Sequence, residues 1–185
     1  MHRTFLILLA LPAPALAQMD HSTMNMTTPT TGMSQSMDLS ALTGKAFDRA
    51  FLSMMIPHHQ AAVAMSQAVL GTRDPKVKAW ATAIIKDQNR EIAQMNTLLK
   101  SYGGVDSKMV GMMKAMTGDM VGSVRSASNK ERAYVQGMTL HHADAIDMAN
   151  LALQKSQNLS VLKLARDITR AQAGEIYDFK AYLLR

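Results

Sequence analysis

The chain has 185 residues, of which 17 are methionine, six are histidine and none is cysteine. The absence of cysteine excludes disulfides and a lipid-modified cysteine as an anchor. The formal net charge of +6 comes from 20 basic and 14 acidic residues, and the basic residues are scattered along the chain, so we expect no nucleic-acid partner.

Residues 1–17 are predicted to be a secretory signal peptide. The first residues are basic, residues 5–11 form a short apolar run, and residues 15–17 match a small-residue cleavage pattern. The apolar run is far shorter than the ~20 residues that are needed to span a bilayer. We therefore expect an exported protein, periplasmic or secreted, that begins at Gln18 and has no membrane anchor.

Residues 18–40 are predicted to form a disordered arm. The segment is rich in threonine, serine, glycine and proline, and apart from methionine its hydrophobicity is too low for a packed core. A disordered tail gains nothing from apolar methionines, which favours metal capture by its donor side chains. The candidate arm site consists of Met19, His21, Met24 and Met26.

A duplicated pattern of histidine and methionine dominates residues 41–185. In each copy a methionine precedes two adjacent histidines and a second methionine follows them, and the two copies are offset by 83 residues. The first copy contains Met55, His58, His59 and Met65, and the second contains Met138, His141, His142 and Met148. Apart from His2 and His21, these are all the histidines of the chain. The repeat therefore indicates a chemical role for these side chains as well as a duplicated fold.

Helical periodicity accompanies each copy of the repeat. Apolar and histidine positions recur every three or four residues through the first copy and again through the second. Turn signals divide each copy into two helices, as where Asp74-Pro75 opens the second helix of the first copy. Pro57 predicts a kink in the first helix or, alternatively, a break between two shorter helices. We expect an all-α four-helix bundle made of hairpin 41–100 and hairpin 129–185.

Residues 101–128 are predicted to be a long crossover between the hairpins. About 28 residues is long for a loop in a bundle, so a short helix within the crossover is expected. A methionine stripe lies on one face of that helix and consists of Met109, Met112, Met116 and Met120. Such a stripe packs against a core more often than it binds metal, and both interpretations stay open.

The duplicated donors are typical of a copper site. Neutral imidazole nitrogen and soft thioether sulfur suit copper ions, whereas zinc favours cysteine, histidine and carboxylate. Met55 lies three residues before His58 and four before His59, so its sulfur can share a helix face with either ring. Met65 is too far along the helix to share one ion with Met55 and His58, so it serves a second position or packs. We expect Cu(I) or Cu(II), with Ag(I) as a mimic of Cu(I).

The returning helix of each hairpin adds polar side chains at the same level. The register of the first hairpin places His58 near Gln88 and Met55 near Glu91, and the second hairpin repeats this arrangement. These side chains are candidate ligands or hydrogen-bond partners of the imidazoles. The complete set consists of Gln88, Glu91, Met95, Gln172 and Glu175.

Two sequence patterns resemble those of the CopM-like secreted proteins, a histidine- and methionine-rich family known as a domain of unknown function. The first is Phe51-(x)3-Met55-Ile56-Pro57-His58-His59-(x)2-Ala62-(x)2-Met65, followed by Gln88-(x)2-Glu91-Ile92. The second is Met138-(x)2-His141-His142-(x)2-Ala145-Ile146-(x)-Met148-Ala149. The resemblance covers about residues 47–184 and implies a ferritin-like four-helix bundle that binds copper outside the cytoplasm.

The expected function is therefore to buffer, sequester or carry copper and to support copper tolerance, without enzymatic activity. Copper ions are the expected partners, another periplasmic copper protein or an exporter is a candidate partner, and oligomerisation is left open. One alternative is a structural or partner-binding bundle that holds no metal. A less favoured alternative is a ferritin-like metal oxidase, which would need Glu-x-x-His motifs that this chain lacks.

Overall fold

The computed structural model describes residues 39–185, a range that contains helices and no strand. The helices are α1 (Gly44–Gln67), α2 (Pro75–Leu99), α3 (Ser107–Ser126), α4 (Lys130–Lys155) and α5 (Leu159–Leu183), with short 3-10 helices at Leu39–Ala41 and Lys100–Tyr102. The all-α prediction is confirmed. The predicted signal peptide and the arm donors Met19, His21, Met24 and Met26 lie outside the described residues. None of the described helices is long and apolar enough to cross a membrane.

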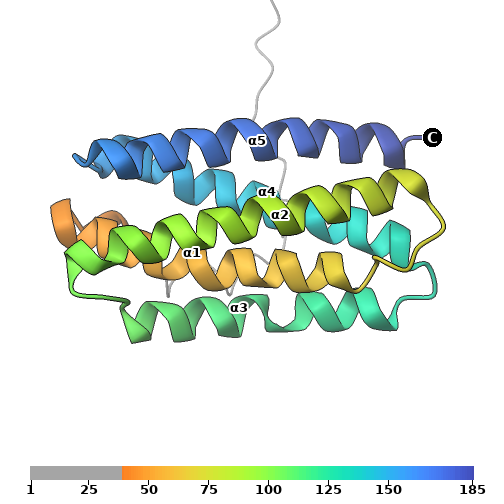
Figure 1. Cartoon of the computed structure of the whole chain (residues 1–185), viewed down its shortest axis with the longest axis horizontal. Coiled ribbons are helices and arrows are strands. Elements are labelled where there is room, and N and C mark those ends of the chain that lie inside the picture. Colours follow the sequence, from red (N-terminus) through yellow and green to blue (C-terminus); the bar gives the residue numbers. More distant parts are fainter. Residues whose placement is uncertain (1–38) are drawn as a thin grey trace, which may run out of the picture. The chain divides into compact units, whose positions relative to one another are not determined.

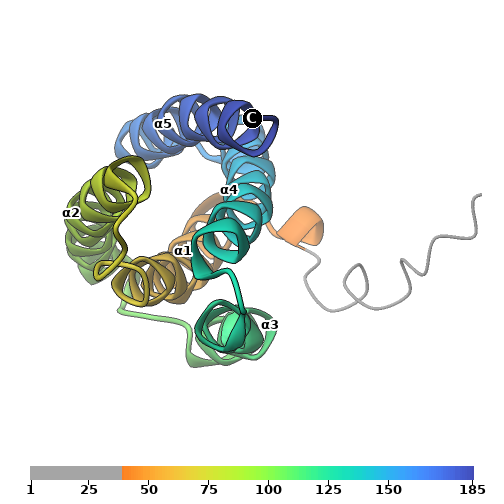
Figure 2. The ribbon, with the colours of Figure 1, turned by 90° about the vertical axis from the view of Figure 1, so that its right-hand side faces the viewer.

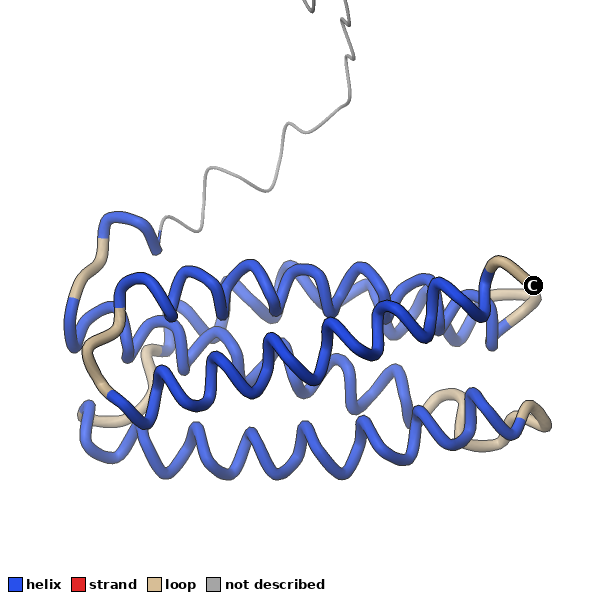
Figure 3. Tube along the Cα trace, turned by 90° about the horizontal axis from the view of Figure 1, so that it is seen from above, coloured by secondary structure: helices blue, strands red, loops and turns tan. Residues whose placement is uncertain are grey.

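The two predicted hairpins are α1–α2 and α4–α5 (Figure 1). Seen along their length, these four helices form a ring, and α3 lies outside it beside α1 and α4 (Figure 2). All five helices run lengthwise beside one another and are joined by loops at the two ends (Figure 3). Because α1 and α4 are antiparallel neighbours, the two copies of the repeat meet side by side near the middle of each helix.

Side-chain caps fix where the returning helices begin. Asp74 accepts hydrogen bonds from the backbone N–H groups of Lys76 and Val77, and Pro75 occupies the first turn of α2. Asn158 accepts equivalent bonds at the start of α5. The predicted Asp-Pro helix start is therefore confirmed.

Helix α1 is buried on nearly every side because it packs against α2, α3 and α4. By contrast, α2 buries a single stripe of side chains spaced three or four residues apart, which runs from Val77 to Leu99. Helix α1 continues through Pro57, so the alternative of two shorter helices is wrong. The close packing around this turn supports the helix where proline removes a backbone donor.

The crossover forms α3, a helix of 20 residues, which is longer than the short helix expected. Asp106 caps its first turn, and Arg49 of α1 donates hydrogen bonds to the carbonyls of Gly104 (2.9 Å) and Val105 (2.8 Å) in the preceding loop. Gly103 and Gly104 have φ angles of 78° and 86°, a left-handed backbone that favours glycine. The start of α3 is thus tied to α1.

Candidate functional site

The four duplicated histidines lie inside the bundle, where the two hairpins meet. Each is at most 1 % exposed. The ring centroids of His58 and His141 are 3.7 Å apart, with an angle of 34° between the ring planes. Nε2 of His141 also donates to the backbone carbonyl of His58 at 2.9 Å. Equivalent residues of the two repeats therefore face each other across the α1–α4 contact.

The second histidine of each pair lies next to a glutamate of the returning helix. Nε2 of His59 lies 2.7 Å from Oε2 of Glu91 and donates a hydrogen bond to it. Nε2 of His142 lies 2.7 Å from Oε2 of Glu175, but the two atoms do not form a hydrogen bond. The sequence register placed Glu91 at the level of Met55, whereas the structure pairs it with His59.

These contacts select one tautomer of the imidazole ring. A carboxylate or a carbonyl can only accept, so Nε2 of His59 and Nε2 of His141 must carry the proton. Their Nδ1 atoms then have free lone pairs, and neither has a hydrogen-bond partner. A ring held by a carboxylate on one nitrogen and bare on the other is the usual arrangement of a metal-binding histidine.

Buried polar atoms without partners are concentrated at this level of the bundle. Among the described residues nine buried side-chain nitrogen or oxygen atoms have no hydrogen-bond partner, and eight of them belong to the four histidines, Gln88 and Gln172. The ninth is Oδ1 of Asp48. An unpaired buried polar atom costs about 1–3 kcal/mol unless water or a ligand satisfies it. These unpaired atoms therefore lower the stability of the metal-free fold, and their arrangement is suited to binding a ligand.

The two facing histidines are neutral at physiological pH. Burial lowers the pKa of His58 well below its usual 6.5, and the neighbouring imidazoles of His141, His59 and His142 lower it further. Burial also lowers the pKa of His141, to about 3, with His142 and His59 adding to the effect and the hydrogen bond to His58 opposing it. Their lone pairs are thus not blocked by protons above about pH 6.

Buried methionines flank the histidines on both sides. Met55 and Met148 belong to one packed core cluster, which also includes Met95. Met65 and Met138 belong to a second cluster. Because α1 and α4 are antiparallel, each cluster combines the first methionine of one repeat with the second methionine of the other. Thioether sulfur therefore lies to both sides of the imidazole layer.

The predicted candidates do not all converge on one point. Within residues 39–185 no three histidine, aspartate or glutamate side chains are grouped so that they could hold a metal ion. That set does not include the thioethers of Met55, Met65, Met138 and Met148, all of which are buried. The structure thus brings together the histidines, the glutamates and the methionines in one part of the bundle, and it leaves the arm residues undescribed.

Helix α3 presents a different methionine face from the one expected. Met109 and Met116 pack against the cluster of Met55, Met120 packs against the cluster of Met65, and Met113 is 2 % exposed. Met112 is not among the residues that pack against either cluster. The inward stripe therefore contains Met113 in place of Met112. The spacing 109, 113, 116 and 120 is also helical and could have indicated this face.

Comparisons with known proteins add a family and a structural relative. The family described as "Domain of unknown function (DUF305)" matches residues 10–99 and 72–183. CopM in its Cu(II)-bound form is 33 % identical, with a TM-score of 0.66 over 73 % of this chain and 94 % of that chain. The Cu(I)-bound form gives 29 % and 0.62 over the same shares, and a silver-soaked form gives 30 % and 0.62 over 73 % and 93 %.

A curated relative matches a shorter stretch. An uncharacterized protein of Acanthamoeba polyphaga mimivirus is 45 % identical over 53 residues, which is 28 % of this chain. The match spans 35 % of that relative's own length. It therefore supports only a local likeness.

Proposed function

This chain belongs to the DUF305 family, and we propose that it is an exported copper-binding protein that buffers, sequesters or carries Cu(I) or Cu(II) and so supports copper tolerance. The observation that carries the proposal is the layer of four buried imidazoles, in which six of the eight ring nitrogens lack a hydrogen-bond partner. A fold that only needed a core would place aliphatic side chains there. A metal ion would satisfy these lone pairs.

The chemistry of the surrounding side chains favours Cu(I) in particular. Imidazole nitrogen and thioether sulfur are the donors, and soft sulfur selects Cu(I) over harder ions. Glu91 accepts a hydrogen bond from His59 and orients its ring, whereas Glu175 lies 2.7 Å from Nε2 of His142 without a hydrogen bond. The likeness to CopM with Cu(I), Cu(II) and silver supports the same group of ions.

Neither alternative accounts for the site as well. In a metal-free structural bundle, eight buried polar atoms around the repeat would stay unpaired, with no ligand to compensate for the lost stability. A di-iron oxidase would need several inward carboxylates and Glu-x-x-His motifs. The chain contains no such motif, and the glutamates beside the duplicated histidines are Glu91 and Glu175. We propose a binding protein and not an enzyme.

The test separates the bundle from the arm. We would titrate Cu(I) and Ag(I) into the chain from Gln18 and into a variant in which Met19, His21, Met24 and Met26 are all serine. We expect the variant to retain tight binding, and bound metal to raise its melting temperature by mass action. Loss of all tight binding in the arm variant would place the function in the arm. An unchanged melting temperature in both proteins would favour the structural alternative.

A further inference from the structure

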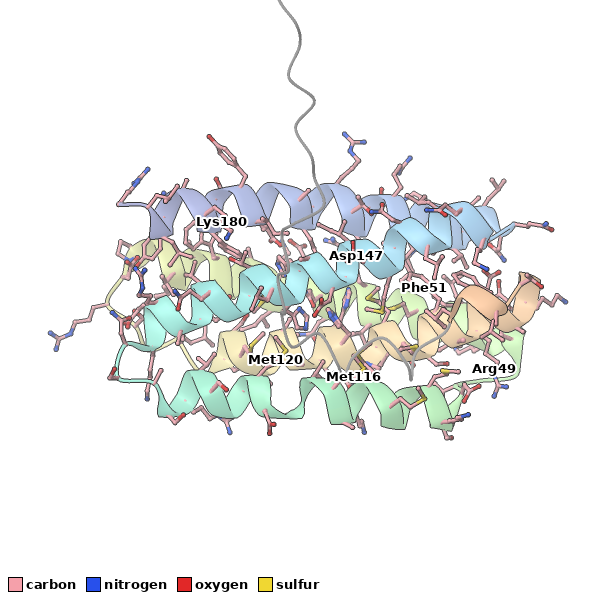
Figure 4. The ribbon with its side chains drawn as sticks, turned by 180° about the vertical axis from the view of Figure 1, so that it is seen from behind. Arg49, Phe51, Met116, Met120, Asp147 and Lys180 are labelled. Atoms are coloured by element: carbon pink, nitrogen blue, oxygen red, sulfur yellow. The ribbon has the colours of Figure 1, made fainter. Side chains whose placement is uncertain are left out.

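A groove runs between α3 and α4, reaches inward to α1 and has a volume of about 460 Å³. Four of the side chains that line it are methionines, namely Met113, Met116, Met120 and Met148. Figure 4 shows the labelled Met116 and Met120 on α3, with their side chains directed toward α1 and α4. The groove is thus rich in thioether sulfur and opens to one face of the bundle.

His58 reaches this groove from α1 and contributes nitrogen to its lining. It is 1 % exposed, and both of its ring nitrogens lack a hydrogen-bond partner. The three other histidines of the repeat each have Nε2 close to an acceptor, so His58 is the exception among them. A buried imidazole with no partner, next to a space lined by sulfur, calls for a ligand that accepts electron pairs.

The rim of the groove carries negative charge. Asp144 and Asp147 of α4 line it and are exposed, and Figure 4 labels Asp147 above the methionines of α3. The chain as a whole has a formal net charge of +6, which repels cations. Two carboxylates at the mouth of the groove reverse the sign locally and favour the approach of a cation.

The methionines of α3 leave space where a packed face would fill it. Met116 and Met120 are only partly buried, although each packs against a core cluster with part of its side chain. Well-packed interfaces leave few voids larger than a water molecule. Sulfur donors around an accessible volume therefore point to a soft metal ion, whereas zinc would require cysteine or more histidine.

We propose that this groove binds one Cu(I) or Ag(I) ion through the thioethers of Met116 and Met120 together with a ring nitrogen of His58. The site shares His58 with the layer of four buried histidines, but it opens to the surface and uses methionines of the crossover helix. The inference rests on the proposed function and extends it by giving the buried imidazoles an accessible neighbouring site for the same ion.

The test uses Ag(I), which reports on soft-donor sites without redox chemistry. The chain from Gln18 would be labelled with ¹³C at the methionine methyl groups, and silver would be added stepwise. We expect the methyl signals of Met116 and Met120 to shift, and the double variant Met116→Leu with Met120→Leu to bind one equivalent of silver less. Leucine conserves volume, so the fold should be kept.

The matched control is Met109→Leu with Met112→Leu, which changes two methionines of the same helix outside the groove. It should bind as much silver as the unaltered protein. If silver binds but the Met116 and Met120 methyls do not move, and the two double variants bind alike, the groove site is overturned and the copper-binding function stands. If the unaltered protein binds no silver, both are overturned.

Discussion

Replacing both His59 and His142 by glutamine should lower the Cu(I) affinity of the bundle by at least about 100-fold. The expected loss is this large because the loss of an orienting partner alone costs about 10–100-fold, and here the ring nitrogens themselves are removed. The amide N–H of glutamine can still donate to Glu91 and Glu175, so the carboxylates stay paired. Competition against a chromogenic Cu(I) chelator would measure the affinity.

The matched control for this variant is His21→Gln, which changes a histidine of the arm. Its Cu(I) affinity at the bundle should equal that of the unaltered protein. Helical circular dichroism should be the same in all three proteins, which excludes unfolding as the cause. An unchanged affinity in the doubly substituted bundle would contradict ligation by His59 and His142.

The metal-free protein should lose stability as the pH falls below about 6.5. In the unfolded chain His58 and His141 take up protons near their ordinary pKa of 6.5, whereas burial lowers both values in the folded protein. The unfolded state therefore binds more protons below pH 6.5. The free energy of unfolding should fall by about 1.4 kcal/mol for each pH unit and each histidine. For His141 the loss should end near pH 3, where the folded form is protonated as well.

Urea unfolding at pH 7.5, 6 and 5 in the presence of a metal chelator would measure this slope. The double variant His58→Leu with His141→Leu is the control, since it removes both titrating rings while keeping a similar volume. It should show a smaller slope, and at pH 7.5 it should be more stable because three unpaired polar atoms leave the core for the loss of one hydrogen bond. A slope equal to that of the unaltered protein would contradict the assignment to these two residues.

The hairpins could be predicted because their signals are local. The cap at Asp74, the proline that follows it and the apolar stripe of α2 each depend on residues close together in the sequence. The length of α3 could not be predicted in this way, because glycines at positions 111, 118 and 122 lower helix propensity while packing against α1 and α4 compensates. The same packing decided which side of α3 faces inward, and hence that Met113 is buried and Met112 is not.

The donor chemistry of the site was also predictable, but its geometry was not. The repeat identified the histidines and methionines, but the register of the hairpin placed Glu91 beside Met55, about one helical turn from His59, with which it pairs. The contact between His58 and His141 depends on how α1 passes α4, which no pattern within one hairpin specifies. The packing of α1 against α4 also explains why one core cluster contains methionines of both repeats, such as Met55 and Met148.

The most direct measurement is ¹⁵N NMR of the imidazole rings during addition of Ag(I) to the chain from Gln18. In the metal-free protein we predict that His59 and His141 carry their proton on Nε2. Silver should then shift the Nδ1 resonance of His59 and that of His142, while the Nε2 proton facing Glu91 is retained. Unmoved imidazole resonances at saturating silver would contradict the central claim that the duplicated histidines bind the metal.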